Sequence, residues 1–437
     1  MSAYDFHVTE VGGPAAAPAG AVTRGSVARV GTATAITALC GYAVIYLAAR
    51  NLAPNGFSVF GVFWGAFGLV TGAANGLLQE STREVRAMQY LNALPDGAAR
   101  THPLRVAGLV GIASAVVIAA TSPLWSGRVF AESRWLSVAL LSIGLAGFCL
   151  HATLLGMLAG TNRWSQYGAL MVTDAVIRVA VAAATFVVGW GLVGFLWATV
   201  AGSAAWLIML LASPASRAAA HLLTPGSTAT FLRGAAHSIT AAGASAILVM
   251  GFPVLLKLTS AHDLGPAGGV VILAVTLTRA PLLVPLTAMQ GNLIAHFVDE
   301  RGHRLRALIS PAALIGGIGA VGVLAAGLVG PWLLRAVFGP EYQASSALLA
   351  WLTTAALAIA LLTLTGAATV AAAMHRAYAS GWVGATVAAG LLLMLPLALE
   401  TRTVVGLLCG PLVGIGVHLT ALARAGRSST GSPPDNV

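Results

Sequence analysis

Residues 49–72 read ARNLAPNGFSVFGVFWGAFGLVTG, and this stretch decides the fold. From Phe57 onward it is an unbroken series of apolar and small residues, typical of a segment that crosses the hydrocarbon core of a membrane. Its beginning, NLAPNG at 51–56, returns as DLGPAG at 263–268, an offset of 212 residues. The stretch therefore combines a membrane-spanning pattern with one copy of an internal repeat.

Two further pairs of segments repeat in the same order along the chain. VGFL at 193–196 matches VGLL at 405–408, again with an offset of 212, and SPLWSGRVFA at 122–131 resembles GPWLLRAVFG at 330–339. Three ordered matches predict that a unit of six helices is used twice. An even number of helices gives both copies the same orientation, which is a parallel repeat of the kind found in transporters.

The composition predicts that lipid covers most of the surface. Of the 437 residues, 58% are hydrophobic and 8% are charged, whereas soluble domains contain roughly 25% charged residues. Twelve apolar runs reach the length of a transmembrane helix, so we expect an all-α integral membrane protein of two parallel six-helix repeats. The runs are 26–49, 57–79, 104–122, 136–160, 166–189, 192–212, 232–256, 267–294, 307–329, 345–372, 377–398 and 403–422.

The repeat and the charges predict the domain organisation. We expect an N-lobe at 24–215 and a C-lobe at 232–424, joined by a cytoplasmic linker at 216–231. Residues 1–23 and 425–437 are expected to be flexible cytoplasmic tails because they are polar and rich in Gly, Pro or Ser. With both termini in the cytoplasm, most arginines fall on cytoplasmic segments, as the positive-inside rule requires. We therefore expect a multi-pass protein of the cell membrane.

Soluble catalytic chemistry leaves no trace in this sequence. There is no GxxxxGK[ST], HExxH or GxSxG motif, and Cys40, Cys149 and Cys409 lie apart inside apolar runs. The positive charges sit at the ends of apolar runs and not on a soluble basic module, so nucleic acid is not an expected partner. We expect no enzyme activity, no cofactor and no metal site.

The charges inside the predicted helices are the candidate functional residues, because ionisable groups in a membrane are costly to place there. Asp174 and Arg178 are four residues apart and share one helix face, so they either form a structural pair or line a cavity of the N-lobe. Arg279 lies midway along 267–294, has no acid within one turn and is followed by Pro281 and Pro285. It is a candidate to bind an anion, with an interhelix contact as the alternative.

Two arginines near the predicted cytoplasmic ends of the first two helices are weaker candidates. Arg29 lies one turn into the first helix, and Arg83 lies at the end of the second beside Glu80 and Glu84. Each either reaches up to the lipid headgroups or lines a basic entrance that attracts an anionic headgroup. The two glutamates can also pair with Arg83 where the helix ends.

In its predicted layout and in four of its segments, the sequence resembles the polysaccharide flippase branch of the multidrug/oligosaccharidyl-lipid/polysaccharide exporter superfamily. The segments that carry the resemblance are 49–72, NRWSQYGALMVTDAVIRVAVA at 162–182, GLVGFLWA at 191–198 and GPWLLRAVFGPEY at 330–342. It implies a MATE-like V-shaped pair of lobes that opens alternately to each side. It also implies a polyprenyl-pyrophosphate-linked glycan as cargo, moved to the outer leaflet for cell-envelope polysaccharide synthesis, and contact with the enzymes that synthesise or polymerise the glycan. Lipid II flippases of this superfamily have cavity arginines on helices 1, 2 and 8. The resemblance implies Arg29, Arg83 and Arg279 as the nearest candidates here, although Arg83 lies lower on the second helix than in that pattern.

Two alternative functions remain open from the sequence. A multidrug/cation antiporter of the same fold needs intramembrane carboxylates, and Asp174 is the one clear candidate. A membrane scaffold that recruits polysaccharide-synthesis enzymes without transporting anything would keep the fold and lose the cavity chemistry. The sequence does not distinguish a scaffold from a transporter.

Overall fold

The computed structural model describes residues 24–89, 99–130, 132–299 and 304–430, and most of them are helical. Each of the twelve predicted runs falls mainly on one helix or on two or three consecutive helical elements. The first half comprises α1 (Arg24–Gln89), α2 (Pro103–Val129), α3 (Arg134–Gly160), α4 (Trp164–Val188), α5 (Gly191–Ala201), the 3₁₀ turn η1 (Gly202–Ala204), α6 (Ala205–Ala212) and α7 (Pro214–Ala220). The second half comprises α8 (Thr228–Val249), α9 (Phe252–Leu258), α10 (Gly265–Asp299), α11 (Arg304–Ala307), α12 (Ile309–Leu328), α13 (Gly330–Phe338), α14 (Ser346–Ala371), α15 (His375–Leu393) and α16 (Leu399–Thr430).

The helices have the length and hydrophobicity of membrane spans. Among the described residues, nine are long and apolar enough to cross a membrane, or ten if the bent pair α8 and α9 is one span. The apolar part of α1, Ala28–Met88, has 61 residues and therefore contains two spans. On α12, Leu314, Val321 and Leu328 are each more than half exposed. A helix face with so many exposed apolar side chains is typical of contact with lipid, because a protein with such a face would aggregate in water.

The break in α1 separates its two spans at Ala53. This residue has φ 52° and ψ 173°, which interrupts the helix immediately before Pro54. A residue before proline is pushed out of the helical region, because the proline ring clashes with its backbone. Gly265, which precedes Pro266 and begins α10, also has a positive φ of 58°. The repeated sequence at 51–56 and 263–268 therefore produces the same backbone turn in both halves.

A second pair of turns supports the repeat. Asn162, between α3 and α4, has φ 57°, and Ala373, between α14 and α15, has φ 59°. These residues are 211 positions apart, nearly the same offset as that of the sequence matches. The order of helices around them is also the same, with a long buried helix before the turn and a more exposed one after it.

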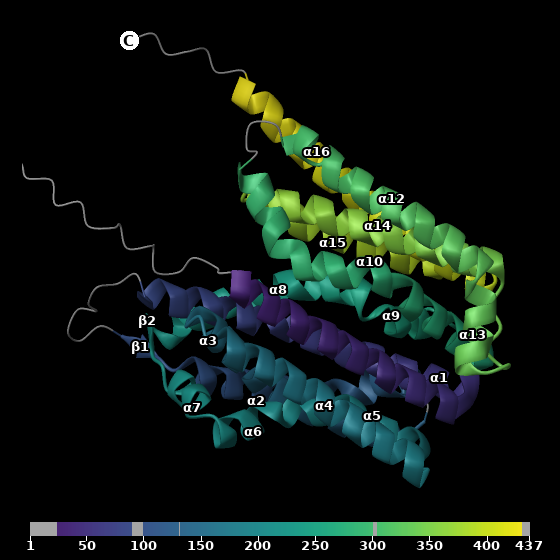
Figure 1. Cartoon of the computed structure of the whole chain (residues 1–437), viewed down its shortest axis with the longest axis horizontal. Coiled ribbons are helices and arrows are strands. Elements are labelled where there is room, and N and C mark those ends of the chain that lie inside the picture. Colours follow the sequence, from purple (N-terminus) through teal and green to yellow (C-terminus); the bar gives the residue numbers. More distant parts are fainter. Residues whose placement is uncertain (1–23, 90–98, 131, 300–303, 431–437) are drawn as a thin grey trace, which may run out of the picture.

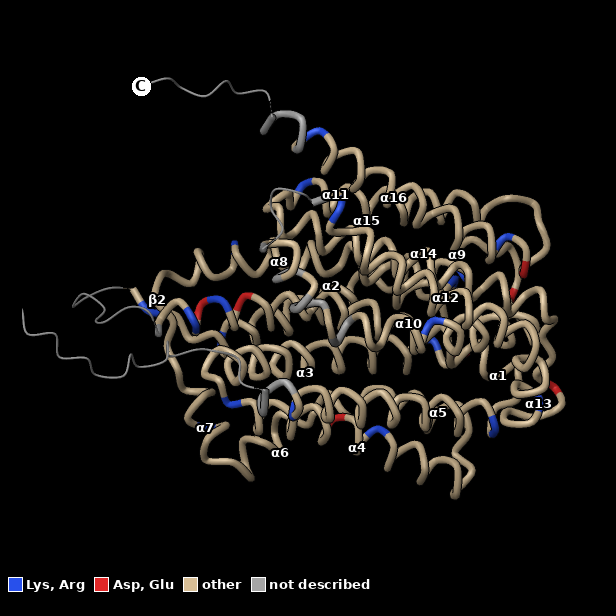
Figure 2. Tube along the Cα trace, turned by 45° about the horizontal axis from the view of Figure 1, so that its top comes forward, with Lys and Arg blue, Asp and Glu red and all other residues tan. Residues whose placement is uncertain are grey.

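The two halves form two groups of helices. Figure 1 shows them meeting near α13, with α14 to α16 diverging from α1 toward the side where α1 begins and α16 ends, while α8 stays beside α1. A short antiparallel pair of strands, β1 (Arg100–Thr101) and β2 (Thr224–Pro225), joins the loop before α2 to the segment before α8. Charged residues lie mainly near helix ends, with few along the helix middles (Figure 2).

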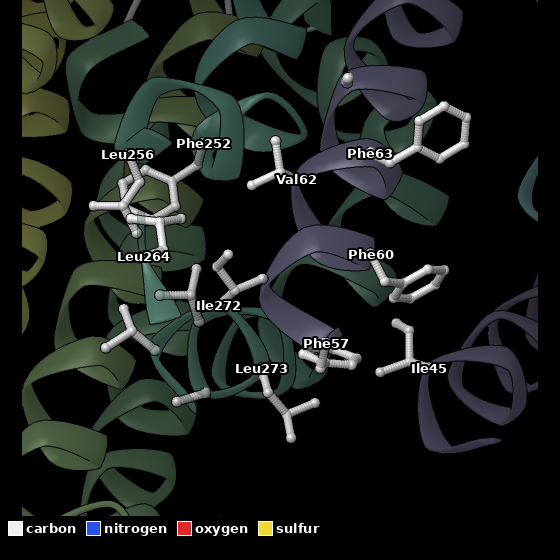
Figure 3. Packing of buried hydrophobic residues seen from close by; sticks show 14 of the residues in the cluster. Ile45, Phe57, Phe60, Val62, Phe63, Phe252, Leu256, Leu264, Ile272 and Leu273 are labelled. Atoms are coloured by element: carbon white, nitrogen blue, oxygen red, sulfur yellow. The ribbon is translucent and has the colours of Figure 1, made fainter. Parts of the chain in front are cut away.

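Small residues bring the halves into close contact along the second span of α1. A Cβ at Gly72 would lie 2.7 Å from the Cβ of Ala246 on α8, and one at Gly76 would overlap the backbone of Ile239. Glycine therefore lets α1 and α8 approach each other, as small residues do in membrane proteins generally. Nearer the middle, Figure 3 shows Val62 and Ile272 between the α1 and α10 ribbons, while Phe60 and Phe63 point to the opposite side of α1.

The predicted tails and boundaries can be compared with the structure only in part. Residues 1–23 lie outside the described residues. At the other end, α16 continues to Thr430, so the first residues of the predicted tail at 425–437 are helical. Ala and Arg are good helix formers, and the single Gly426 in this segment does not end the helix. The run predicted at 377–398 also ends early, since α15 stops at Leu393, shortly before Pro396.

Candidate functional site

The seventh predicted span is broken near its C-terminal end. Helix α8 ends at Val249 and α9 begins at Phe252, with an angle of 67° between them. The last carbonyl groups of a helix have no partner within it, and in a membrane such groups need another donor. The carbonyl groups at the end of α8 therefore need a hydrogen-bond donor from another part of the protein.

Arg279 on α10 supplies that donor. Its Nη1 donates to the carbonyl oxygens of Val249 at 2.9 Å and Leu248 at 3.4 Å. Its guanidinium carbon lies 5.3 Å from the ring centre of Phe252, the first residue of α9. A cation is favourable at a helix C-terminus, where the helix dipole is negative. The side chain thus holds both sides of the break, which is the interhelix contact that the sequence analysis left as the alternative.

One terminal nitrogen of the same guanidinium has no partner among the described residues. Arg279 is 93% buried, with 7% of its surface exposed, and within the described part of the chain its Nη2 has no hydrogen-bond partner. It lines a cavity of about 340 Å³ that also includes the hydroxyl-bearing Thr37 from the first span of α1. The Oγ1 of Thr37 is likewise buried without a partner among the described residues. Two unsatisfied donors from different halves of the molecule therefore line one cavity.

Thr34 and Thr276 also line the cavity, but their hydroxyls donate to carbonyls of their own helices, and the other walls are apolar or aromatic. They come from both spans of α1, from α4, from the α8–α9 break and from α10, with Tyr42, Phe60 and Trp64 among the aromatic residues. Among the described residues that line it, Arg279 is the one charged side chain and no carboxylate is present. Such a cavity favours a ligand with an anionic group and an apolar part.

Asp174 and Arg178 form an ion pair away from the cavity. The Nη2 of Arg178 lies 3.0 Å from the Oδ1 of Asp174, with both side chains largely buried. Nη1 of Arg178 donates to the carbonyl of Thr199 at 2.6 Å, and its guanidinium carbon lies 5.4 Å from the ring centre of Phe67. Gly202 leaves no room for a Cβ beside the pair. The two residues join α4 to α1, α5 and η1, and neither is among the residues that line the Arg279 cavity.

Arg29 and Arg83 lie toward the two ends of α1 and are also absent from the cavity lining. Nη2 of Arg83 lies 2.6 Å from Glu80 and 2.7 Å from Glu84, and its side chain is 63% exposed. Its charge is thus offset by two carboxylates. Arg29 is exposed and donates a long hydrogen bond of 3.4 Å to Ser165 on α4.

Sequence reasoning identified Arg279 but missed the two features that define its surroundings. The break in the seventh span has a signal in Gly251 and Pro253, which interrupt the apolar run LVMGFPVLL. Thr37 has no such signal, because Thr32, Thr34 and Thr37 all occur in the first apolar run. The hydroxyls of Thr32 and Thr34 donate to carbonyls of their own helix. Thr34 also lines the cavity, and the structure distinguishes Thr37 because its buried hydroxyl has no partner among the described residues.

The fold of this chain is similar to that of solved MATE transporters. No family model matches the chain. A solved inward-facing multidrug resistance MATE family transporter of the MOP superfamily covers 93% of this chain and 100% of its own, with a TM-score of 0.68 and 14% identity. An outward-facing structure of such a transporter covers 93% and 96%, with a TM-score of 0.66 and 14% identity. The prediction of a helical membrane protein with the MATE-like arrangement of two six-helix repeats is confirmed.

The relatives by sequence are mycobacterial. Uncharacterized protein Rv3630 of Mycobacterium tuberculosis is 81% identical over 423 residues, which cover 95% of this chain and 98% of that protein. Uncharacterized protein Mb3654 of Mycobacterium bovis has the same identity and coverage. Uncharacterized protein Rv1510 of Mycobacterium tuberculosis is 70% identical over 417 residues, covering 95% of this chain and 96% of that protein. The chain belongs to the protein family of Rv3630 and Rv1510, and it is a multi-pass membrane protein with the fold of the MATE transporters.

Proposed function

We propose that this protein is an alternating-access transporter that flips a glycan, joined to a polyprenol through a phosphate or a pyrophosphate, from the cytoplasmic to the outer leaflet for cell-envelope polysaccharide synthesis. The pyrophosphate-linked form is the cargo that the sequence resemblance implies. The observation that carries the proposal is the free Nη2 of Arg279, buried in a cavity whose walls come from both halves of the molecule. No enzyme activity is proposed.

The physical problem for such a transporter is the phosphate group. An anion is far more stable in water than in the hydrocarbon core, so its hydration must be replaced during the crossing. Guanidinium is well suited to this, because it stays protonated and matches the geometry of phosphate oxygens. The Thr37 hydroxyl, from the first span of α1, offers a second donor to the same cavity. The polyprenyl tail needs no such site, because it can remain in the lipid.

The cavity chemistry favours this cargo over a cationic drug. A multidrug/cation antiporter needs an acidic group near its substrate, and the described lining of the cavity contains a cation instead. Asp174 is paired with Arg178 and is not among these lining residues. For orientation, we propose that both termini face the cytoplasm of the cell, as the distribution of arginines indicates.

Translocation of a fluorescent polyprenyl-phosphoryl hexose in proteoliposomes tests the proposal. We expect the purified full chain to move the probe between leaflets, and Arg279→Gln to slow this about tenfold or more, since a hydrogen bond to a charged group contributes about 1.5–3 kcal/mol. Arg335→Gln is the matched control, because Arg335 is on α13 and bonds to Pro331 of its own helix. Thr37→Val, which removes one hydroxyl only, should slow transport by a smaller factor.

Three results would contradict the proposal. Full activity of Arg279→Gln would remove the assigned site. Uptake of an organic cation, but not of the lipid probe, would indicate a cation antiporter. A well-folded parent chain that moves neither would favour a scaffold role, which pull-down of polysaccharide-synthesis enzymes could then support.

A further inference from the structure

The number of charges in the cavity limits the charge of its ligand. Among its described lining residues, Arg279 is the one charged group, and its Nη1 already donates to Leu248 and Val249. The Nη2 group is what remains for a ligand. A glycan joined to a lipid through one phosphate is a phosphodiester with one negative charge. The same glycan joined through a pyrophosphate carries two.

A second negative charge would have no partner in this cavity. The faces of Phe60 and Trp64, which line it, carry negative π-electron density and do not stabilise an anion. An unpaired charge in an apolar site costs several kcal/mol, as estimates for buried ions show. The other predicted cations do not compensate, because Arg29 and Arg83 are not among the lining residues and Arg83 already pairs with Glu80 and Glu84.

The size of the cavity points in the same direction. At about 340 Å³, it lies near the lower end of the range for small-molecule pockets, about 300–1,000 Å³. It can hold a phosphate with the adjoining part of one sugar more easily than a pyrophosphate with a larger glycan.

We infer that the cargo headgroup is a monoanionic phosphodiester, a sugar joined to a polyprenol through a single phosphate, and not a pyrophosphate. This inference rests on the proposed function and narrows its substrate class. In this arrangement Nη2 of Arg279 donates to one phosphate oxygen and Thr37 to another. Most of the remaining lining residues are apolar or aromatic and suit the first isoprene units of the lipid.

Binding of two matched probes tests the inference. Both are short polyprenols carrying one labelled hexose, joined through a phosphodiester in one and through a pyrophosphate in the other. We expect the full chain in phosphatidylcholine nanodiscs to bind the phosphodiester at least about tenfold more tightly, which corresponds to about 1.4 kcal/mol. Arg279→Gln should remove this preference together with most of the binding, while Arg335→Gln should change neither.

A charge added to the cavity provides an independent test. Thr276 lines the cavity three residues before Arg279 on α10, and its hydroxyl bonds to its own helix at Ile272. Thr276→Lys should raise the affinity for the pyrophosphate probe relative to the phosphodiester probe, because it supplies the missing cation. Thr276→Val also removes the hydroxyl bond to Ile272 but adds no charge, so it should keep the original preference.

The outcomes separate this inference from the proposed function. Tighter binding of the pyrophosphate probe by the parent chain, with loss in Arg279→Gln, would overturn the inference and leave the flippase function standing. Binding of neither probe by a monodisperse parent chain would overturn both. An unchanged preference in Thr276→Lys would show that the cavity charge does not set the selectivity, and would also overturn the inference.

Discussion

The Tyr342 hydroxyl donates a 2.9 Å hydrogen bond to the backbone carbonyl of Ala49, a residue 293 positions earlier in the chain. Tyr342 lies between α13 and α14, whereas Ala49 is in the last turn of the first span of α1. Around this bond, the ring centre of Tyr342 lies 6.2 Å from that of Phe57 and 6.2 Å from that of Phe338. The bond and the aromatic cluster hold the two halves together at the end of the molecule where Figure 1 shows them meeting.

Removing this hydroxyl should loosen the contact between the halves. Tyr342→Phe leaves the carbonyl of Ala49 without that donor and keeps the ring, so we expect the free energy of unfolding to fall by about 1 kcal/mol. Thermal unfolding of the purified protein in detergent measures the change. Tyr46→Phe is the control, since Tyr46 contacts Phe338 in the same cluster but is 41% exposed. Equal losses in the two variants would contradict a special role for the Ala49 bond.

The same tyrosine should make stability depend on pH in the alkaline range. Burial, with a smaller contribution from nearby Glu341, raises the pKa of the Tyr342 phenol above its ordinary value of 10.0. A group whose pKa is raised by folding stabilises the protein fully below its unfolded pKa and loses this contribution as pH rises through the folded value. The parent chain should therefore lose stability above about pH 10 more steeply than Tyr342→Phe. Parallel pH dependences would show that Tyr342 does not contribute.

The glycine contacts of α1 predict a pair of substitutions with opposite effects. Gly76→Ala places a Cβ against the backbone of Ile239, which cannot move as a flexible side chain can, so we expect a loss of about 1–3 kcal/mol. Gly41→Ala is the matched control, because nothing lies within 4 Å of its Cβ position. It should be neutral or stabilising by up to about 1 kcal/mol, the helix propensity gained over glycine. Similar unfolding temperatures for the two variants would contradict the close approach of α1 and α8.

Substitutions of Asp174 and Arg178 should have strongly non-additive effects on the free energy of unfolding. Arg178→Gln leaves the carboxylate of Asp174 largely buried without its cation, and we expect a loss of about 3 kcal/mol. Asp174→Asn should cost less, because Arg178 keeps its bond to Thr199 and its contact with Phe67. The double variant should be more stable than Arg178→Gln alone, since no unpaired charge remains. A double-mutant cycle measured by unfolding tests this, and additive losses would argue against a structural pair.

The sequence alone predicted much of the architecture, for reasons that are local and physical. Runs of apolar residues long enough to cross a membrane must form helices there, because the backbone has no other hydrogen-bond partners. The repeat of Pro54 and Pro266 predicted equivalent segments, and the structure has the same positive-φ turn before both prolines. The pairing of Asp174 with Arg178 and of Arg83 with Glu80 followed from their spacing on one helix face.

Contacts between distant segments could not be predicted in this way. The sequence left open whether Arg279 binds an anion or forms an interhelix contact. Its partners are the backbone carbonyls of Leu248 and Val249, about 30 residues away, and these carbonyls are available only because the helix breaks there. Carbonyls carry no signal in the sequence, because every residue has one. The same holds for Ala49, the acceptor for Tyr342.

Whether a feature could be predicted from the sequence depends on how far apart in the chain its interacting residues lie. Membrane spanning, turns and same-face ion pairs depend on residues within a few positions of one another, and so the sequence by itself determined them. The cavity depends on how α1, α8, α9 and α10 pack, and this packing places Arg279, and not Arg178, in its lining together with Thr37. Only the tertiary structure decided that one free cationic group and one hydroxyl line the same cavity, because their proximity arises from helix packing and not from the chain between them.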